Sequence, residues 1–451
     1  MQQKSGVDCS YYHEGLFRSW IALGMLSALY VLALVDRQIL VLLIAPIKEH
    51  FQLSDVQIGL LIGTAFAIVY SLLGLPAGRF ADRGNRKRLV IAGVLIWCFS
   101  TIASGFASTY MALIILRLGL AAGEAVLTPA AHSMIGDLFP PQKRTLAASL
   151  FSSAGFVGSP LAFSGGALLI LTIESANQTG ILASFDVWQL VLFAVGAPGL
   201  VLAGMFAILV NEPARMSKAQ QLELAATKSV KDQILAHKKL YAGLLLSASL
   251  AAGCSYSVYN WLTESLIRDF GWNAVEAGAV FGPLSLVAAV SGVLSAPWLS
   301  QRLRARGRSD SVVLVSLMLA LICAVALGLG PLQTSPNLRL ALIGIGLFAT
   351  LGSSMNIVVS MQEVAPSRMR ATFVAILFIG ISLFGGGIVP VLVPMVADLV
   401  GGGLSPALAL VCALLSALSA LLLFWIRADF EREATAGFPD IGECNPLAPA
   451  A

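Results

Sequence analysis

Charged side chains are scarce in this chain. They make up 12% of the 451 residues, and hydrophobic residues make up 57%. An ordinary soluble domain carries about 25% charged residues, so the composition argues against a soluble fold. The net charge of +4 is mild. In a membrane protein such a balance is typical of basic loops, and we expect no nucleic-acid partner.

Residue types that carry catalysis or bind metals are also few. The chain has four histidines and six widely spaced cysteines, and no two histidines stand at metal-ligand spacing. It lacks a Gly-x-x-x-x-Gly-Lys-Ser/Thr phosphate loop, which disfavours an ATP-driven pump. A membrane enzyme would need several reactive groups at one depth, and only His132 lies in or near a span. We predict no enzyme, no metal and no cofactor, with a proton as coupling ion.

What the chain has is long apolar runs. A transmembrane helix needs about 20 apolar residues, and twelve such segments can be placed. They cover 19–46, 58–78, 89–107, 110–136, 145–171, 187–210, 240–265, 275–299, 312–332, 338–361, 371–397 and 404–426. The predicted fold is therefore an all-α polytopic membrane protein with twelve transmembrane helices in two pseudo-symmetric bundles of six.

Basic residues are distributed unevenly between the two sides of these spans. Of the 28 lysines and arginines, 23 fall on one side, three on the other (Lys48, Arg268 and Arg339), and two inside spans. Because basic residues collect in cytoplasmic loops, we expect both termini in the cytoplasm. The expected location is the cell (inner or plasma) membrane.

The chain divides into two halves around a polar linker. We predict a cytoplasmic tail at 1–18, a first bundle at 19–210, a cytoplasmic linker at 211–239, a second bundle at 240–427 and a cytoplasmic tail at 428–451. The segment from Asp137 to Arg144 resembles the segment from Glu363 to Arg370, with one constant offset along the chain. Phe51 and Gly59 match Phe270 and Gly278 at a second, slightly smaller offset. Such parallel repeats predict a substrate site between the halves.

Four charged residues are predicted to lie at bilayer depth. They are Asp36 and Arg37 in the first span, and Arg117 and Glu124 in the fourth. Facing lipid, each would cost about 3 kcal/mol, or about 12 kcal/mol together. We therefore expect them to face a wet cavity or each other, and their signs allow two ion pairs. A buried ion-pair network that only orients helices is the alternative.

The spacing within the fourth span favours a shared ligand. Arg117 and Glu124 are seven residues apart, which places them on one helix face about 10 Å apart along the axis. The second half has no comparable charge, so its wall would be apolar and aromatic, for example Tyr256, Tyr259, Trp261 and Phe378. Core packing is the alternative, and the commoner one, for such residues. A cavity charged on one wall and apolar on the other suits an amphipathic substrate with an anionic or zwitterionic head.

The loop after the second span resembles the signature loop of the major facilitator superfamily. It reads Gly78-Arg-Phe-Ala-Asp82-Arg83-Gly-Asn85-Arg86-Lys87-Arg88. An acid at a helix end can pair with nearby bases and hold one conformer, so we assign conformational gating to Gly78, Asp82, Arg83, Arg86 and Lys87. The matching loop of the second half, which ends at Arg308, has no acidic partner, and we expect no such latch there.

Within that superfamily, several motifs resemble the Spinster family. They are Asp36-Arg37, the Asp82–Lys87 loop, Arg117-Leu-Gly-Leu-Ala-Ala-Gly-Glu124, Pro129 and Asp137-Leu-Phe-Pro. The resemblance implies a lipid transporter for sphingolipids or lysophospholipids, coupled to protons. It places functional roles on Asp36, Arg37, Arg117 and Glu124.

Physical chemistry suggests how these roles divide. A buried carboxylate beside an arginine is balanced between its charged and neutral forms, so we assign proton coupling to Asp36 and Glu124. Substrate binding falls to Arg37, Arg117 and Glu124. Two alternatives stay open: a proton-coupled transporter of small organic anions or drugs, like the anion:cation symporters, and a lipid sensor that does not transport. We expect a functional monomer whose partners are a small amphipathic substrate and the lipid bilayer.

Overall fold

The computed structural model describes residues 10–177, 184–213, 230–366 and 369–436. Twelve helices in this part of the chain are long and apolar enough to cross a membrane, and no strand occurs there. The predicted all-α fold with twelve spans is confirmed. The predicted linker boundaries and both tails depend in part on residues outside the described ranges, so they stay predictions.

The first half contains six spans built from ten elements. They are α1 (Ser10–Leu42), α2 (Ile44–Phe51), α3 (Asp55–Gly59), the π-helical η1 (Leu60–Thr64), α4 (Ala65–Arg83), α5 (Arg86–Ser104), α6 (Tyr110–Glu124), α7 (Leu127–Leu138), α8 (Pro141–Asn177) and α9 (Val187–Leu209).

The second half has the same plan. Its elements are α11 (Val230–Ala236), α12 (Lys238–Phe270), α13 (Ala274–Ala305), α14 (Ser311–Leu329), the 3-10 turn η2 (Gly330–Leu332), α15 (Pro336–Val364), α16 (Arg370–Gly380), the π-helical η4 (Ile381–Ile388), α17 (Val389–Val400) and α18 (Leu404–Ala436).

The first span ends earlier than predicted. Helix α1 stops at Leu42, and the short helix α2 follows after a turn at Leu43. Proline has no N–H to donate to the carbonyl four residues back, and its ring crowds that carbonyl. Pro46 therefore disfavours continuation of the helix past Leu42. Hydropathy alone cannot see this break, because the sequence stays apolar through it.

Internal repetition extends beyond the two matches seen in the sequence. Ser54 and Asn273 stand at the same offset as Phe51 and Phe270, and each begins a helix as the N-cap of a capping box, closed by Gln57 and Glu276. Two residues before each N-cap, Gln52 and Gly271 are left-handed and end the preceding helix. A capping box satisfies two orphan N–H groups at a helix start, so both halves begin this span in the same way.

The second match repeats a side-chain contact. Arg144 donates from Nε to the carbonyl of Phe139 at 2.9 Å, and its repeat equivalent Arg370 donates from Nε to the carbonyl of Ala365 at 3.4 Å. In both halves the arginine returns to the chain five residues earlier. The repeat therefore preserves local hydrogen bonding as well as residue type.

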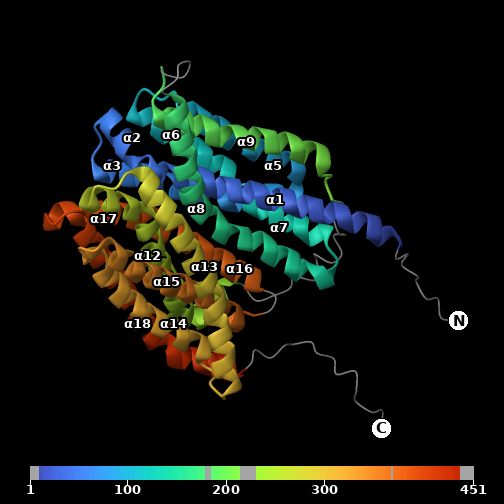
Figure 1. Ribbon diagram of the computed structural model, residues 1–451. Helices are drawn as coiled ribbons and strands as arrows, with labels where there is room; N and C mark the ends of the chain where they lie inside the picture. Colours follow the sequence, from blue (N-terminus) through green and yellow to red (C-terminus); the bar gives the residue numbers. More distant parts are fainter. Residues whose placement is uncertain (1–9, 178–183, 214–229, 367–368, 437–451) are drawn as a thin grey trace, which may run out of the picture.

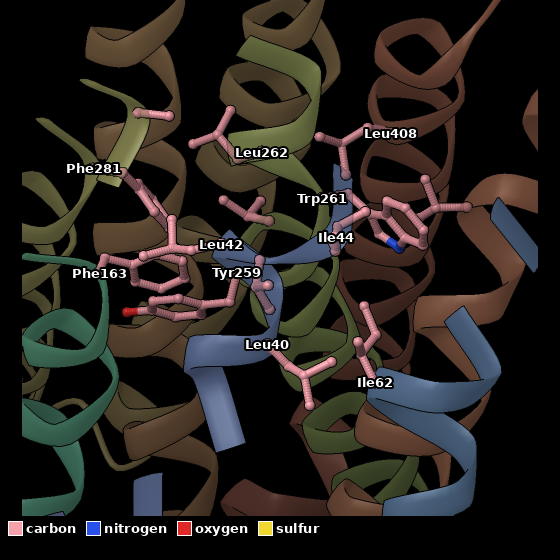
Figure 2. Close-up of a cluster of buried hydrophobic side chains, with 14 of the residues drawn as sticks. Leu40, Leu42, Ile44, Ile62, Phe163, Tyr259, Trp261, Leu262, Phe281 and Leu408 are labelled. Atoms are coloured by element: carbon pink, nitrogen blue, oxygen red, sulfur yellow. The ribbon is translucent and has the colours of Figure 1, made fainter. Parts of the chain in front are cut away.

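The two halves lie one above the other in Figure 1, blue to green above and yellow to red below. One buried hydrophobic cluster belongs to the first half, centred on Leu26, Trp97 and Phe151, and another to the second half, centred on Tyr241 and Phe373. A third cluster joins them, and Figure 2 shows its Phe163, Tyr259 and Phe281 rings gathered at the junction.

Glycines bring the halves into backbone contact. A Cβ added to Gly63 would lie 3.0 Å from the carbonyl oxygen of Gly386, and one added to Gly282 would lie 2.7 Å from the backbone nitrogen of Ser164. Gly63 and Gly282 share the offset of Phe51 and Phe270, so they are repeat equivalents. Thr64, in η1, also donates to the Gly387 carbonyl in η4 at 2.6 Å. The two π-helical segments thus meet across the junction.

Helix α1 begins and α18 ends on one side of the protein, which we call the terminal side; the opposite side is the far side. The contacts between the halves described above lie toward the far side. Ion pairs add to the closure there. Arg268 binds Asp55 of the other half through two hydrogen bonds of 2.6 and 2.8 Å. Lys48 also binds Asp55, and Glu264 binds Arg268. On the opposite, terminal side, ion pairs such as Arg304–Glu363 stay within one half. The structure is therefore closed on the far side.

We predict that Gly63→Ala and Gly282→Ala shift the protein toward conformers open on the far side. Each added methyl meets backbone atoms that cannot rotate away, and overpacking costs about 1–3 kcal/mol, which is roughly a 5- to 150-fold change in the ratio of closed to open forms. Glu49 and Val400 are exposed on the far side and belong to different halves. We expect the distance between spin labels at these two positions, measured by double electron–electron resonance, to be longer in both variants than in the wild type.

Gly204→Ala in α9 is the matched control, because a Cβ there meets nothing within 4 Å. Unchanged distance distributions in both junction variants would show that these glycines do not hold the far side closed.

Candidate functional site

The four charges predicted at bilayer depth converge within the first half. Asp36 and Arg37 lie on α1, and Arg117 and Glu124 lie on α6. Asp36, Arg117 and Glu124 are each 2% exposed. The side chain of Arg37 keeps 16% of its surface exposed. Arg37 is thus the member of the cluster with the most open surface.

One strong ion pair forms in this cluster. Arg37 donates from Nη2 to Glu124 Oε2 at 2.7 Å. Its guanidinium carbon lies 3.9 Å from the centre of the Phe66 ring and 5.1 Å from that of Tyr70. Both rings come from α4 and stack on one another. A carboxylate and two aromatic faces therefore fix the arginine, which is a favourable setting for a partly desolvated cation.

The second ion pair that the signs allow does not form. Thr101 of α5 donates to Asp36 Oδ2 at 2.5 Å, and Arg117 donates from Nη2 to the backbone carbonyl of Arg37 at 3.0 Å. Among the described residues, Asp36 and Arg117 are not joined by an ion pair. Arg117 instead holds the backbone of α1, and so positions the residue that pairs with Glu124.

Several polar atoms of the cluster have no protein hydrogen-bond partner in the described part of the chain. They are Asp36 Oδ1, Arg37 Nε, Arg117 Nε and Nη1, and Glu124 Oε1. Leaving a buried polar group unsatisfied costs about 1–3 kcal/mol, and more for a charged one. These atoms can therefore each form a further hydrogen bond, with water or with a ligand.

The aromatic wall expected from the second half is only partly present. Tyr259 stacks on Phe163 at the closed junction and is 9% exposed. Trp261 is fully buried and donates to the Pro390 carbonyl at 2.7 Å. Their assignment to an open wall is wrong, because both serve the packing that closes the far side. Phe378 of α16 is exposed, and Tyr256 is partly buried beside Gly386.

A buried arginine begins α5, directly after the turn that follows α4. Arg86 is 1% exposed and binds Asp137 at the end of α7, Glu212 after α9, and the Ser133 carbonyl. Glu212 also accepts a hydrogen bond from the backbone nitrogen of Lys87 at 2.7 Å. Its carboxylate therefore lies at the positive end of α5, where negative charge is stabilised.

The other residues assigned to gating differ among themselves. Arg83 is exposed and the side chain of Lys87 is partly buried. Gly78 lies 4.0 Å, measured from an added Cβ, from Pro129 of its own half. The side chain of Asp82 lies outside what the structure describes. Among the described residues assigned to gating, Arg86 thus forms most of the hydrogen bonds and ion pairs.

The second half does have acidic partners, contrary to expectation. Arg304 forms two hydrogen bonds with Glu363, at 2.6 and 2.8 Å. Asp310 binds Arg308 and Arg427. Burial tends to raise the pKa of Asp310, but the hydrogen bonds from Arg308 and Arg427 outweigh burial and hold that pKa below its ordinary value. The prediction failed for Glu363 because it comes from a distant span, which a local motif cannot reveal. It failed for Asp310 because the compared loop was ended at Arg308, two residues too early.

Sequence reasoning missed Thr101, Phe66 and Glu212. Thr101 and Phe66 are ordinary residues of apolar spans, and no spacing rule singles them out. Glu212 stood out only as the start of a polar linker. An isolated acid directly after a span, on the side rich in arginine, is a signal that could have marked it.

Comparison with known proteins places this architecture. Residues 26–390 match the family model described as Major Facilitator Superfamily. The chain is 28% identical over 430 residues to the D-galactonate transporter of Escherichia coli, covering 90% of this chain and 95% of that protein. It is 27% identical over 265 residues to the sphingosine-1-phosphate transporter SPNS2 of Danio rerio, covering 57% of this chain and 50% of that protein.

A solved structure shares both fold and sequence. It is a bacterial homologue of the human lysosomal transporter Spinster, in an inward-facing and occupied conformation. It has a TM-score of 0.73 and 27% identity, covering 93% of this chain and 97% of that one. The family model spans most of this chain, and the twelve spans and the paired halves agree with it. The chain therefore belongs to the major facilitator superfamily of multi-pass membrane transporters and, within it, resembles the Spinster proteins.

Proposed function

We propose that this protein is a proton-coupled transporter of an amphipathic lipid with an anionic or zwitterionic head, working by alternating access. The observation that carries this proposal is the Arg37–Glu124 pair: a mostly buried cation, held by a carboxylate and flanked by two aromatic rings. An anionic head group would then bind an arginine side chain whose orientation is already fixed. The rings of Phe66 and Tyr70 would contact the apolar part next to the head.

Competition for Arg37 supplies a coupling mechanism. An anionic head that binds Arg37 displaces Glu124, whose other oxygen has no protein partner among the described residues. A buried, unpaired carboxylate is costly, and taking up a proton removes the charge. Substrate binding would thereby favour proton uptake at Glu124. Asp36, equally buried and bonded to the neutral hydroxyl of Thr101, is the second proposed proton site.

The names of the relatives support an anionic cargo but differ on its size. The SPNS2 relative is named for a phosphorylated sphingoid base, and the Escherichia coli relative for D-galactonate, a sugar acid. A small organic anion is therefore the second candidate, favoured by the fuller coverage of that alignment. The aromatic surroundings of Arg37 favour the lipid.

Flux into proteoliposomes tests the transport proposal. We expect net uptake of a lysophospholipid or a phosphorylated sphingoid base, faster with an imposed proton gradient. Uptake of D-galactonate with no lipid uptake would select the second candidate. Binding of the lipid without flux would favour the lipid sensor and contradict transport.

We predict that Arg37→Ala lowers lipid uptake by roughly 10- to 150-fold, the range expected for losing a hydrogen bond to a charged group worth about 1.5–3 kcal/mol. Arg37→Lys should recover part of the loss, because it keeps the charge without the planar fork. Arg306→Ala is the control, since Arg306 is an exposed arginine at the end of α13 with no role assigned to it. Equal uptake by Arg37→Ala and the wild type would remove Arg37 from the site.

For proton coupling, we expect Glu124→Gln to transport at the same rate with and without a proton gradient, because the amide cannot gain or lose the coupling proton. Asp36→Asn should weaken the response. The measurement is a pH-jump uptake assay in vesicles. If both variants keep the wild-type response to the gradient, the assignment of protons to these carboxylates fails.

We also propose that the Arg86 cluster acts in gating, by fastening the chain after α9 to the start of α5. Glu212→Gln removes the charge that caps α5, so hydrogen–deuterium exchange at residues 86–90 should speed up. Glu363→Gln, which breaks a comparable pair in the other half, is the control and should leave that exchange unchanged. Equal exchange in all three proteins would show that Glu212 does not stabilise this loop.

A further inference from the structure

A small cavity lies inside the first half, beside the Arg37–Glu124 pair but separate from it. Its volume is about 10 Å³. Its polar wall is formed by Asp36, Thr101, Ser104 and Arg117, and its apolar wall by Leu40, Ile47, Leu61, Leu113, Leu120 and Leu192. A cavity of about 10–15 Å³ is the smallest that can hold one water molecule.

Two charged residues that line this cavity have side-chain atoms without a protein partner. Asp36 and Arg117 are each 2% exposed and line it together. Asp36 Oδ1 and the Nε and Nη1 atoms of Arg117 have no protein hydrogen-bond partner among the described residues. The remaining atoms are occupied, Asp36 Oδ2 by Thr101 and Arg117 Nη2 by the Arg37 carbonyl. The two charged residues that line the cavity therefore have one acceptor atom and two donor atoms left without a protein partner.

The charges of the wall decide which ligand fits. A monovalent cation would be attracted by Asp36 but repelled by Arg117. An anion would be attracted by Arg117 but repelled by Asp36. An apolar atom would leave both charged groups unsatisfied. Water alone, among occupants of this size, can donate to a carboxylate oxygen and accept from a guanidinium at once.

We propose that this cavity holds one water molecule that bridges Asp36 and Arg117, and that Asp36 gains and loses its proton through this water. The bridge explains why the two residues share a cavity without forming an ion pair. The volume of about 10 Å³ limits the site to one water. The proton-exchange part rests on the proposed function, whereas the hydration part does not.

The cavity shares only Arg117 with the residues assigned to substrate binding. Arg37 and Glu124, the pair that carries the proposed function, do not line it. The other titratable or charged groups near Asp36 are Cys98 of α5, Arg37 of its own helix, and Arg117 and Glu124 of α6. Filling the cavity should therefore affect Asp36 without removing the cation that holds the anionic head.

Radiolytic footprinting in ¹⁸O-labelled water tests the hydration site directly. Hydroxyl radicals formed from a trapped water label adjacent side chains even when these are buried. In the intact protein in detergent or vesicles, we expect ¹⁸O incorporation at Leu113 and Leu120 to exceed, by several-fold, that at Leu26 and Leu29. The latter are fully buried leucines of the same half that do not line the cavity. Equal labelling of the two pairs would overturn the proposal.

A filled cavity tests the role of the water. Leu113→Phe should abolish the excess labelling at Leu120 and reduce the acceleration of uptake by a proton gradient, while downhill exchange of labelled substrate continues. Leu113→Met is the milder variant if the phenylalanine chain does not fold, and Leu29→Phe is the overpacking control. Lost labelling with an unchanged response to the gradient would overturn the proton-exchange part. A wild-type protein with no response to the gradient would instead refute the proposed function and leave the hydration site standing.

Discussion

The ion pair between Arg37 and Glu124 determines how the rest of the first half is arranged. Both charges lie at bilayer depth, where an unpaired charge costs several kcal/mol. To bring them together, α1 must lie within side-chain reach of α6 at this depth, and α4 must present Phe66 and Tyr70 to the free face of the guanidinium. Arg117 then ties the α1 backbone to α6. Three of the six spans are thus positioned around one pair.

Each half is held together internally by a different kind of polar contact. The second half uses neutral groups: Ser416 bridges the thiols of Cys254 and Cys323, at 3.2 and 3.1 Å. Asn356 binds Ser300 at 2.9 Å. Hydroxyl, thiol and amide groups do not change charge near neutral pH, so these contacts are insensitive to protons. These contacts therefore differ from the Arg37–Glu124 pair of the first half, which is an ion pair.

The sequence predicted which charged residues would lie together inside the spans better than it predicted how they would pair. Asp36, Arg37, Arg117 and Glu124 could be singled out because a charge in an apolar run is conspicuous and costly. Their pairing depends on the rotation and depth of α1 relative to α6, which sequence spacing does not specify. The same holds for Arg304 and Glu363. Their segments could be recognised, but their contact needed the packing of α13 on α15.

The internal repeat is the sequence pattern that the structure extends to further residues. One constant offset was found from Phe51 and Gly59, and the structure extends it to the caps at Ser54 and Asn273 and to the junction glycines. Breaks within spans were not predictable in this way. The turn at Leu43 and the π-helical η1 and η4 interrupt runs whose hydropathy is continuous, and their position depends on one proline or on backbone contacts across the junction.

The closed far side combines two kinds of contact with different costs of separation. The glycine contacts bury backbone and small apolar surface, so parting them exposes no unpaired charge. Arg268 and Asp55 keep 31% and 18% of their side chains exposed, so water can replace the ion pair as it opens. Exposed pairs of this kind contribute only about 0–1 kcal/mol. Because neither contact leaves a buried charge behind, the far side can open without the penalty that breaking Arg37–Glu124 would incur, and a rocking motion can leave the charged centre intact.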